Sequence, residues 1–238
     1  MFPLIQKRAM NTSHAKGGAK PDVVSAEEWA RARAELLAAE KKVTHAEDAV
    51  AAQRRRLPMV RFRSDYAFAA PSGPVSLRDL FAGHDQLLLY QFMDRGPDRL
   101  CPGCTWVTDG IPANGLTRLA QAGVSWATVS NMPLEQLQRV WERQGWMHVP
   151  FASSRGTTFA ADSGAGNGFL LSVFLRDGDE VYRTYTTSQR GVDRLVFANT
   201  MRDLLPFGRQ EAWEDSPPGW PQHPTWWVQD LPHPRANK

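Results

Sequence analysis

Cysteine is nearly absent from this chain of 238 residues, which has only Cys101 and Cys104. Two cysteines cannot build a disulfide framework or complete a structural zinc site alone. The chain is therefore neither a disulfide-rich mini-protein nor a small zinc domain held together by cysteines. No stretch approaches about 18 uninterrupted apolar residues, so no transmembrane helix is expected. The 28 basic and 25 acidic side chains leave a net charge of +3, which is too weak to indicate nucleic acid binding.

The start of the sequence does not lead us to expect a secretory leader. The first eight residues, Met-Phe-Pro-Leu-Ile-Gln-Lys-Arg, have neither the basic start nor the apolar run of roughly 7–15 residues that a signal peptide needs. We therefore expect a cytoplasmic protein, in a compartment where cysteine pairs are usually redox-active or metal-binding. Residues 1–22 have no periodicity and predict a mobile tail, within which Met10 is a second candidate for the start.

A long helix is predicted over residues 23–57, with Ser25 and Glu28 as a capping box and Pro58 ending it. Large apolar residues recur every seven positions, and alanines stand three positions after them: Trp29, Leu36, Val43, Val50 and Leu57, with Ala32, Ala39 and Ala46. This pattern is an a/d seam. Such a stripe must be covered, either by the same helix of a second subunit in a homodimer or by the chain's own domain.

Alternating strands and helices are predicted over residues 58–206, and residues 148–168 are interpreted as a loop. The expected strands are 60–62, 66–68, 86–93, 124–130, 169–175 and 180–185. A helical crossover makes the strands at 86–93 and 124–130 parallel, and Asp177-Gly178 joins the last two as an antiparallel hairpin. The order β, α, β, α, β-hairpin, α, with an extra hairpin in front, predicts an α/β protein with a thioredoxin-like fold.

A Trp/Pro-rich extension over residues 207–238 follows this domain. Its tryptophans are Trp213, Trp220, Trp226 and Trp227. We interpret them as an ordered cap wrapped over the domain, and the alternative is an aromatic lid over a hydrophobic pocket. Trp106, close to the two cysteines, is interpreted in the same way as a packing residue or as the floor of a substrate groove.

The motif Cys101-Pro102-Gly103-Cys104 stands just after the first buried strand and begins a helix. A helix N-terminus presents unpaired amides and a partial positive charge, which stabilise a thiolate. Thiols in Cys-X-X-Cys motifs so placed have pKa values of roughly 3.5–7.5. The motif therefore predicts a redox-active dithiol, in which the exposed Cys101 attacks as the nucleophile and Cys104 resolves the mixed disulfide.

Two other interpretations of the pair stay open at this point. The cysteines are either structural thiols of a non-catalytic binding or assembly protein, or half of a metal site. His84, His148 and His223 are the candidates to join them around copper, because imidazole and thiolate ligands suit soft metals. With only two strong soft ligands, we predict no zinc, no copper and no cofactor. The expected partners are protein or small-molecule thiols and disulfides.

Several motifs resemble one known family over about Val23 to Trp227. They are Val24-Ser25-Ala26-Glu27-Glu28-Trp29, Arg55-Arg56-Leu57-Pro58-Met59-Val60, Tyr90-Gln91-Phe92-Met93, Cys101-Pro102-Gly103-Cys104, Gly145-Trp146, Ser172 to Gly178 and Gly208 to Pro217. The chain is similar to the thioredoxin-like proteins catalogued as domain of unknown function 899. These are described as predicted dithiol-disulfide isomerases or oxidoreductases related to the peroxiredoxin/thiol-antioxidant group. The resemblance implies that fold and a thiol–disulfide activity.

The chain departs from these relatives at three places. Gln91 stands where the family strand usually has a histidine, and if that histidine tunes the thiol or binds a metal, this chain has lost it. Thioredoxins place a cis-proline before the third core strand, but Asn167-Gly168 stand there, and the nearest upstream proline is in Val149-Pro150. In the peroxiredoxin pattern, the places of the proline and the threonine hold Asp94 and Asp98. Peroxide reduction by that pattern is not expected. Arg95 and Arg99, interleaved with these aspartates, are interpreted as a solvated loop.

Overall fold

The computed structural model describes residues 20–97 and 99–230. Its eight-stranded sheet has the order β1-β8-β7-β4-β5-β6-β2-β3. The strands are β1 (Val60–Phe62), β2 (Phe68–Ala70), β3 (Gly73–Val75), β4 (Gln86–Phe92), β5 (Val124–Ser130), β6 (Phe151–Ser153), β7 (Leu170–Asp177) and β8 (Glu180–Thr187). The α-helices are α1 (Ala26–Arg56), α2 (Pro102–Asp109), α3 (Ala113–Gln121), α4 (Leu134–Gln144), α5 (Phe159–Asp162) and α6 (Phe197–Arg202), and the 3-10 helices are η1 (Asp79–Phe81), η2 (Gln189–Leu195) and η3 (Trp227–Asp230).

The middle of the sheet has the predicted topology. β4 pairs in parallel with β5 and antiparallel with β7, and β7 and β8 form the hairpin. Helices α2 and α3 connect β4 to β5, and this crossover is what allows the two strands to run parallel. Gly178 in the hairpin turn has a φ of +57°, a conformation that glycine adopts at little cost. The strand order β5-β4-β7-β8 confirms the thioredoxin-like α/β fold.

Three local predictions differ from the structure. The stretch 148–168 is not only a loop, because it contains β6 and α5. The front hairpin is formed by β2 and β3, and it joins β6 at the sheet edge opposite to β1. The last helix, predicted from the spacing of Val192, Leu195, Val196, Met201 and Leu204, is divided into η2 and α6. These elements have three to seven residues, too short for a hydrophobic period to indicate them.

Side chains of β4 alternate between the two faces of the sheet, so the strand contributes to two core groups. Leu87 and Leu89 belong to the group that also contains residues of β1, η1 and α5. Tyr90 and Phe92 belong to the other group, together with both cysteines and residues of α2, α4 and η2. The cysteines are therefore part of one hydrophobic core, against the face of the sheet that Tyr90 lines.

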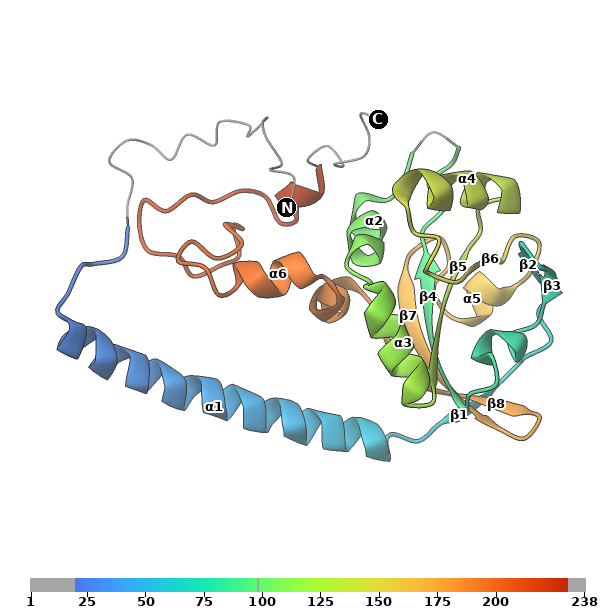
Figure 1. Cartoon of the computed structure of the whole chain (residues 1–238), viewed down its shortest axis with the longest axis horizontal. Coiled ribbons are helices and arrows are strands. Elements are labelled where there is room, and N and C mark those ends of the chain that lie inside the picture. Colours follow the sequence, from blue (N-terminus) through green and yellow to red (C-terminus); the bar gives the residue numbers. More distant parts are fainter. Residues whose placement is uncertain (1–19, 98, 231–238) are drawn as a thin grey trace.

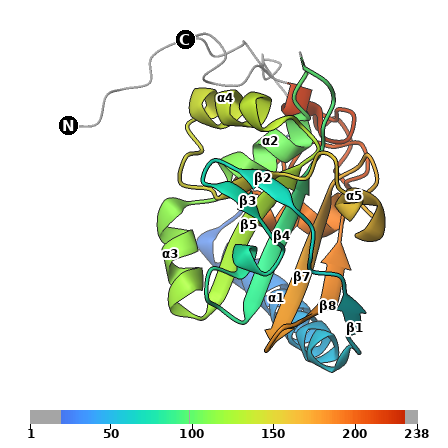
Figure 2. The same cartoon turned by 90° about the vertical axis from the view of Figure 1, so that its right-hand side faces the viewer.

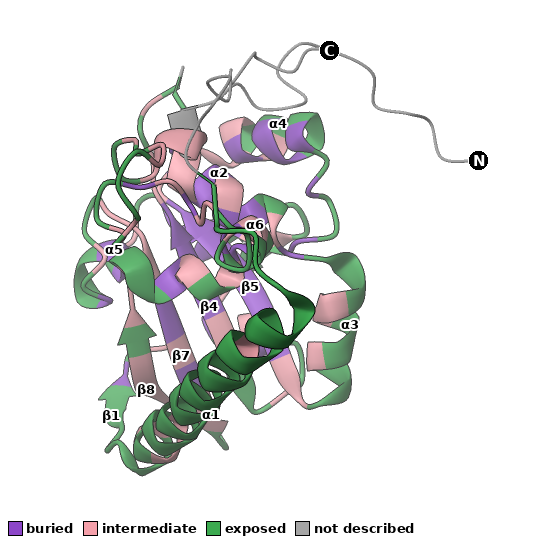
Figure 3. Ribbon diagram, turned by 90° about the vertical axis from the view of Figure 1, so that its left-hand side faces the viewer, coloured by how far each residue is buried: buried purple, intermediate pink, exposed green. Residues whose placement is uncertain are grey.

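Helix α1 begins at the predicted capping box. The Glu28 backbone N–H donates to Ser25 Oγ at 3.2 Å, and the Ser25 N–H donates to the Glu28 carboxylate at 3.0 Å. Figure 1 shows α1 as an arm set away from the sheet, and Figure 2 shows it on the far side of the sheet from β2 and β3. Figure 3 shows it exposed along nearly its whole length, and it has no buried residue.

The rest of the chain contacts α1 mainly in the C-terminal half of this helix. Glu47 lies 4.0 Å from Arg194 in an ion pair, and the Arg54 guanidinium stands 5.3 Å from the Tyr185 ring centroid. Within the described residues the domain does not cover the apolar seam. No helix in this part of the chain is long and apolar enough to span a membrane. Residues 1–19 of the predicted tail lie outside the described residues.

Candidate functional site

The two cysteines lie where the first turn of α2 begins. Cys101 is the N-cap residue in extended conformation, and Pro102 takes the first helical position, where a missing N–H costs nothing. The Cys104 backbone N–H donates to Cys101 Sγ at 3.5 Å. The two residues approach to 3.3 Å without a disulfide, and both are free thiols. This is the helix-terminal geometry that the motif predicts.

Exposure of the pair differs from the prediction. Cys101 is only 7% exposed, and Cys104 is fully buried. The first cysteine was expected at an exposed end, but residues that pack around the start of α2 cover it. Reagents therefore reach the Cys101 sulfur through a space between the covering residues, and not from an open surface.

The environment separates the acidities of the two thiols. The hydrogen bond from the Cys104 thiol lowers the pKa of Cys101 to about 6, although burial acts in the opposite direction. Backbone N–H groups of Gly103 and Cys104 and the positive charge of Arg95 act with that hydrogen bond. Burial, and after it the interaction with Cys101, raises the pKa of Cys104 well above its ordinary value. At neutral pH the pair therefore consists of a Cys101 thiolate and a Cys104 thiol.

Residues of β4 contact Cys104 from the sheet side. The Met93 backbone N–H donates to Cys104 Sγ at 3.5 Å. The buried Tyr90 hydroxyl interacts with Cys104 electrostatically, and its own pKa is raised by burial first and by Cys104 second. Gln91, by strand alternation, lies on the opposite face of the sheet from the cysteines. Residue 91 is therefore not positioned to act on either thiol directly.

A cavity of about 260 Å³ adjoins Cys101. Its lining comes from β4 and the residues after it, from Cys101 and α2, from the residue before β7, from η2 and α6, and from the C-terminal segment. The lining residues are Tyr90, Met93, Arg95, Cys101, Pro102, Gly103, Val107, Phe169, Gln189, Val192, Asp193, Val196, Asn199 and Trp226. The Cys101 thiol thus adjoins a partly open cavity whose walls come from five separate parts of the chain.

Two buried charged side chains hold the C-terminal segment in place. Arg209, 6% exposed, donates to Asp193 at 2.7 Å and to the two oxygens of Asp203 at 2.6 and 2.7 Å. Glu211, 1% exposed, accepts from the Trp226 backbone N–H at 3.0 Å. Because Asp193 itself lines the cavity, these contacts fix Trp226 relative to the wall that η2 provides.

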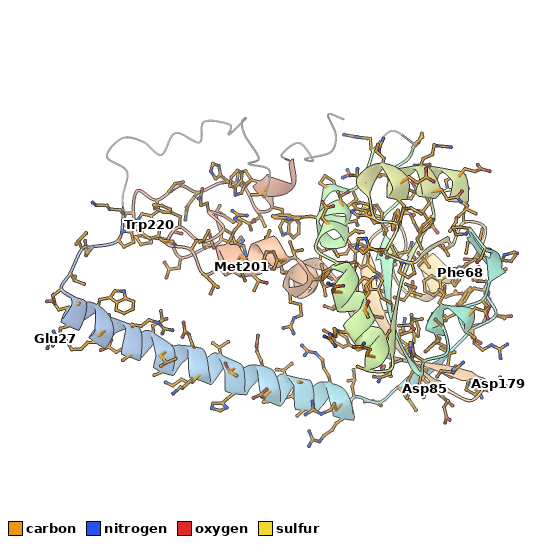
Figure 4. All side chains as sticks on the ribbon, viewed as in Figure 1. Glu27, Phe68, Asp85, Asp179, Met201 and Trp220 are labelled. Carbon is orange, nitrogen blue, oxygen red and sulfur yellow. The ribbon has the colours of Figure 1, made fainter. Side chains whose placement is uncertain are left out.

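The C-terminal tryptophans have different roles. Trp226 lines the cavity, as the lid alternative requires. Trp220 packs edge-on against Phe207 with ring centroids 5.0 Å apart, and Figure 4 shows it on the side of the segment away from the sheet. The Arg190 guanidinium lies 3.7 Å from the ring centroid of Trp213. Trp220 thus packs within the segment, and Trp213 packs against η2. The lid interpretation therefore applies to Trp226, and the cap interpretation applies to Trp213 and Trp220.

The histidines considered as copper ligands lie at separate places. His84 Nδ1 is 2.9 Å from Ser125 Oγ, and His148 Nε2 is 2.8 Å from the Ile111 carbonyl oxygen. His223 is in the C-terminal segment. Residues 20–97 and 99–230 contain no group of three or more His, Cys, Asp or Glu side chains placed to hold a metal ion. The structure does not bring these histidines to the cysteines.

The structure also shows the surroundings of the other residues that depart from the family pattern. Asp94 accepts from the Gly96 N–H at 2.9 Å within its own loop, whereas Asp98 lies outside the described residues. The described residues contain no cis peptide bond, so Val149-Pro150 is trans. Phe169, directly before β7, lines the cavity instead.

Sequence reasoning did not identify several residues of this site. In the sequence, Tyr90 appears only as part of an apolar run. The available signal was strand alternation, which places Tyr90 and Gln91 on opposite faces of the sheet. Phe169 and Asn199 carry no local signal, because the fold brings them to Cys101 from distant segments. Trp106, which the sequence offered as a groove floor, packs against the core and is not among the lining residues.

Solved structures with a similar arrangement include redox proteins. Peroxiredoxin Q from Xanthomonas campestris is 19% identical, with 57% of this chain and 90% of that chain covered and a TM-score of 0.38. A thiol:disulfide interchange protein from Bacteroides sp. is 16% identical, covering 66% and 94%, with a TM-score of 0.43. A secreted disulfide oxidoreductase from Mycobacterium tuberculosis is 15% identical, covering 56% and 92%, with a TM-score of 0.37.

The fold and the site together define a thioredoxin-like protein with a cysteine pair at a helix N-terminus. The chain belongs to the family described as "Bacterial protein of unknown function (DUF899)", which matches residues 18–231. This confirms the resemblance found in the sequence motifs. No curated protein matches the chain.

Proposed function

We propose that the protein is a thiol–disulfide oxidoreductase or isomerase in which Cys101 attacks and Cys104 resolves. The observation that carries this proposal is the asymmetry of the pair, because Cys101 has a pKa of about 6 and the adjacent Cys104 stays protonated. A thiolate is the nucleophile in disulfide exchange, and a protonated, buried second thiol is kept for the second step.

The reaction follows from these two states. The Cys101 thiolate attacks one sulfur of a disulfide, and the other sulfur leaves as a thiolate that takes a proton from water. Cys104 then gives up its proton and attacks Cys101 Sγ, which releases the substrate's first sulfur as a thiol. The net change is one substrate disulfide reduced to two thiols and the protein dithiol oxidised to a disulfide. A thiol reductant regenerates the dithiol, and neither a metal nor a cofactor takes part.

The three parts of the chain divide this work in our proposal. Residues 58–206 carry the dithiol, residues 207–230 of the C-terminal extension cover it, and residues 23–57 pair with a second copy; residues 231–238 of the extension lie outside the described residues. Reduced thiols fit a cytoplasmic location, where thiol reductants keep such pairs reduced.

We further propose an antiparallel homodimer through α1. The seam is exposed: Trp29 is 62%, Leu36 55% and Val43 60% exposed. Acidic residues stand in the first turn of α1 and three arginines in its last turn. Antiparallel pairing brings these opposite charges together, whereas parallel pairing would place the arginines side by side. A second copy of this chain is therefore the occupant that the helix fits.

The dithiol proposal is tested by trapping. A Cys104→Ser variant should accumulate mixed disulfides through Cys101 with disulfide-containing partners, because the resolving thiol is missing. Cys101→Ser is the matched control and should trap none. Mass spectrometry after non-reducing separation locates the bond. Equal trapping by both variants, or slow alkylation of Cys101 in the wild-type protein, would favour a non-catalytic binding protein.

A further inference from the structure

One buried polar atom of a residue that lines the cavity beside Cys101 has no hydrogen-bond partner among the described residues. It is Asn199 Oδ1, on a side chain that is 2% exposed. The hydroxyl of Tyr90, which also lines the cavity, interacts with the Cys104 thiol. Buried polar groups in native proteins are nearly always paired, and an unpaired one calls for a missing partner. A bound molecule that offers a donor to Asn199 Oδ1 would satisfy it.

The rest of the wall is apolar and aromatic. Val107, Phe169, Val192, Val196 and Trp226 form it. A cavity of about 150 Å³ holds benzene, and drug-sized ligands occupy about 300 Å³ or more. The cavity of about 260 Å³ therefore accepts one aromatic or aliphatic ring with a few further atoms. A folded protein segment does not fit into this volume, and Cys101 presents too little surface to react outside it.

Trp226 is held in place at this cavity by its backbone. Its φ of +65° lies in the left-handed region, which a bulky residue rarely adopts. The Glu211 carboxylate accepts from its N–H and fixes this conformation. Unusual backbone at a ligand-lining residue is a common feature of binding sites. The ring of Trp226 is thus positioned as a wall and does not belong to a free tail.

We propose that this cavity binds a small, uncharged organic disulfide with a ring-sized apolar substituent, and that Phe169 and Trp226 set that size limit. The inference rests on the proposed dithiol function and adds the substrate class to it. Exchange follows the balanced steps given above. Cys101 takes one half of the small disulfide, the other half leaves as a thiol, and Cys104 releases the bound half.

The experiment measures single-turnover exchange of the reduced full-length protein with three probes. The first is 2,2′-dipyridyl disulfide, which is uncharged, ring-sized and carries nitrogen acceptors. The second is glutathione disulfide, which is larger and charged, and the third is insulin, a protein disulfide. We expect the initial rate to saturate with dipyridyl disulfide and to stay linear in concentration with glutathione disulfide and insulin. Iodoacetamide, a small alkylating agent, reports Cys101 reactivity independently of binding.

Variants connect the saturation to the cavity. Val196→Phe should fill it and reduce the apparent second-order rate for dipyridyl disulfide at least about ten-fold, and it should slow the smaller iodoacetamide by a clearly lower factor. Asn199→Leu removes an acceptor to which dipyridyl disulfide offers no donor, so it should not raise the half-saturating concentration for this probe. Trp226→Ala removes a wall that is not part of the main core and should raise the half-saturating concentration at least about five-fold. Val23→Phe, at a position 87% exposed, is the matched control and should change nothing.

The outcomes separate the two proposals. The inference is overturned if the rates with dipyridyl disulfide are linear in concentration, or if they saturate and the Val196→Phe and Trp226→Ala variants leave that saturation unchanged. In either case, fast alkylation of Cys101 leaves the dithiol proposal standing. Slow alkylation of Cys101 in the wild-type protein overturns the dithiol proposal itself. Circular dichroism of each variant verifies folding, and Trp226→Ala decides the question if Val196→Phe fails to fold.

Discussion

The backbone N–H of Trp226 donates a hydrogen bond of 3.0 Å to the buried carboxylate of Glu211, whose other oxygen accepts from Trp213 Nε1 at 2.6 Å. One carboxylate thus ties two tryptophans of the C-terminal segment together. Charge-assisted bonds of this kind are stronger than neutral ones. Because Trp226 lines the cavity beside Cys101, the state of Glu211 is coupled to the access of reagents to that thiol.

Glu211→Ala should open the site. The substitution leaves two donors without their acceptor, and we expect the free energy of unfolding to fall by about 2 kcal/mol. Alkylation of Cys101 by a bulky maleimide should accelerate several-fold, while the iodoacetamide rate rises much less. Glu211→Gln keeps one acceptor oxygen, so its free energy of unfolding and its maleimide rate should lie between those of the wild-type protein and Glu211→Ala. Glu180→Ala, at a surface ion pair, is the control. An unchanged maleimide-to-iodoacetamide ratio would mean that Trp226 does not limit access.

The pH dependence of alkylation should report the acidity of Cys101. Only the thiolate reacts, so the rate should rise with pH through a midpoint at about 6 and level off above about pH 7. In Cys104→Ala the largest stabilising contact is lost, and the midpoint should move up toward that of an ordinary thiol. Cys104→Ser retains a hydroxyl donor and should move it less. A wild-type midpoint above pH 8 would contradict the assigned thiolate.

The dithiol was predictable from the sequence because its causes are local. A continuous apolar run, Cys101-Pro102-Gly103-Cys104 and the following helical stretch are adjacent in the chain, so the strand, the helix N-cap and the cysteine pair follow from one segment. The cavity was not predictable in the same way. Asn199 and Trp226 reach Cys101 only after the sheet is complete, and the residues that hold Trp226 are ordinary charged side chains in the sequence.

The burial of Cys101 has the same origin. Period and spacing place it at a helix N-terminus, where thiols are commonly accessible, and this gave the expectation of an exposed nucleophile. The structure covers it because η2 and the C-terminal segment pack against α2, and nothing in the sequence indicates that these distant segments meet there. Long-range packing, and not local propensity, therefore decides which molecules reach the thiol.

Arg209→Ala should destabilise the protein strongly. Its guanidinium pairs with Asp193 and Asp203 while 6% exposed, and removing it leaves the largely buried Asp193 with the longer ion pair to Arg190 at 3.5 Å. Breaking a buried pair in this way costs about 3 kcal/mol. Arg61→Ala, which removes an exposed ion pair with Glu180, is the matched control and should cost less than about 1 kcal/mol. Urea denaturation of both variants measures the difference, and equal losses would show that Arg209 does not anchor the segment.

The apolar seam of α1 should hold two copies of the chain together. From Trp29 to Val50 it extends over about 30 Å, and its exposed side chains lose contact with water only if another helix covers them. Alanines at alternate seam positions permit the close approach that helix pairing requires. We expect light scattering to give a dimer for the full-length protein at micromolar concentration.

Substitution within the seam should abolish this dimer. The double variant Leu36→Glu, Val43→Glu places two charges at the centre of the interface, whereas Lys41→Glu adds a negative charge on the opposite face of the same helix. The first should be a monomer with unchanged Cys101 alkylation, because α1 lies away from α2, which begins at the cysteines (Figure 1). The second should remain a dimer. A full-length protein that is monomeric at tens of micromolar would contradict the pairing. If the seam variant is still a dimer, another surface of the protein forms the contact.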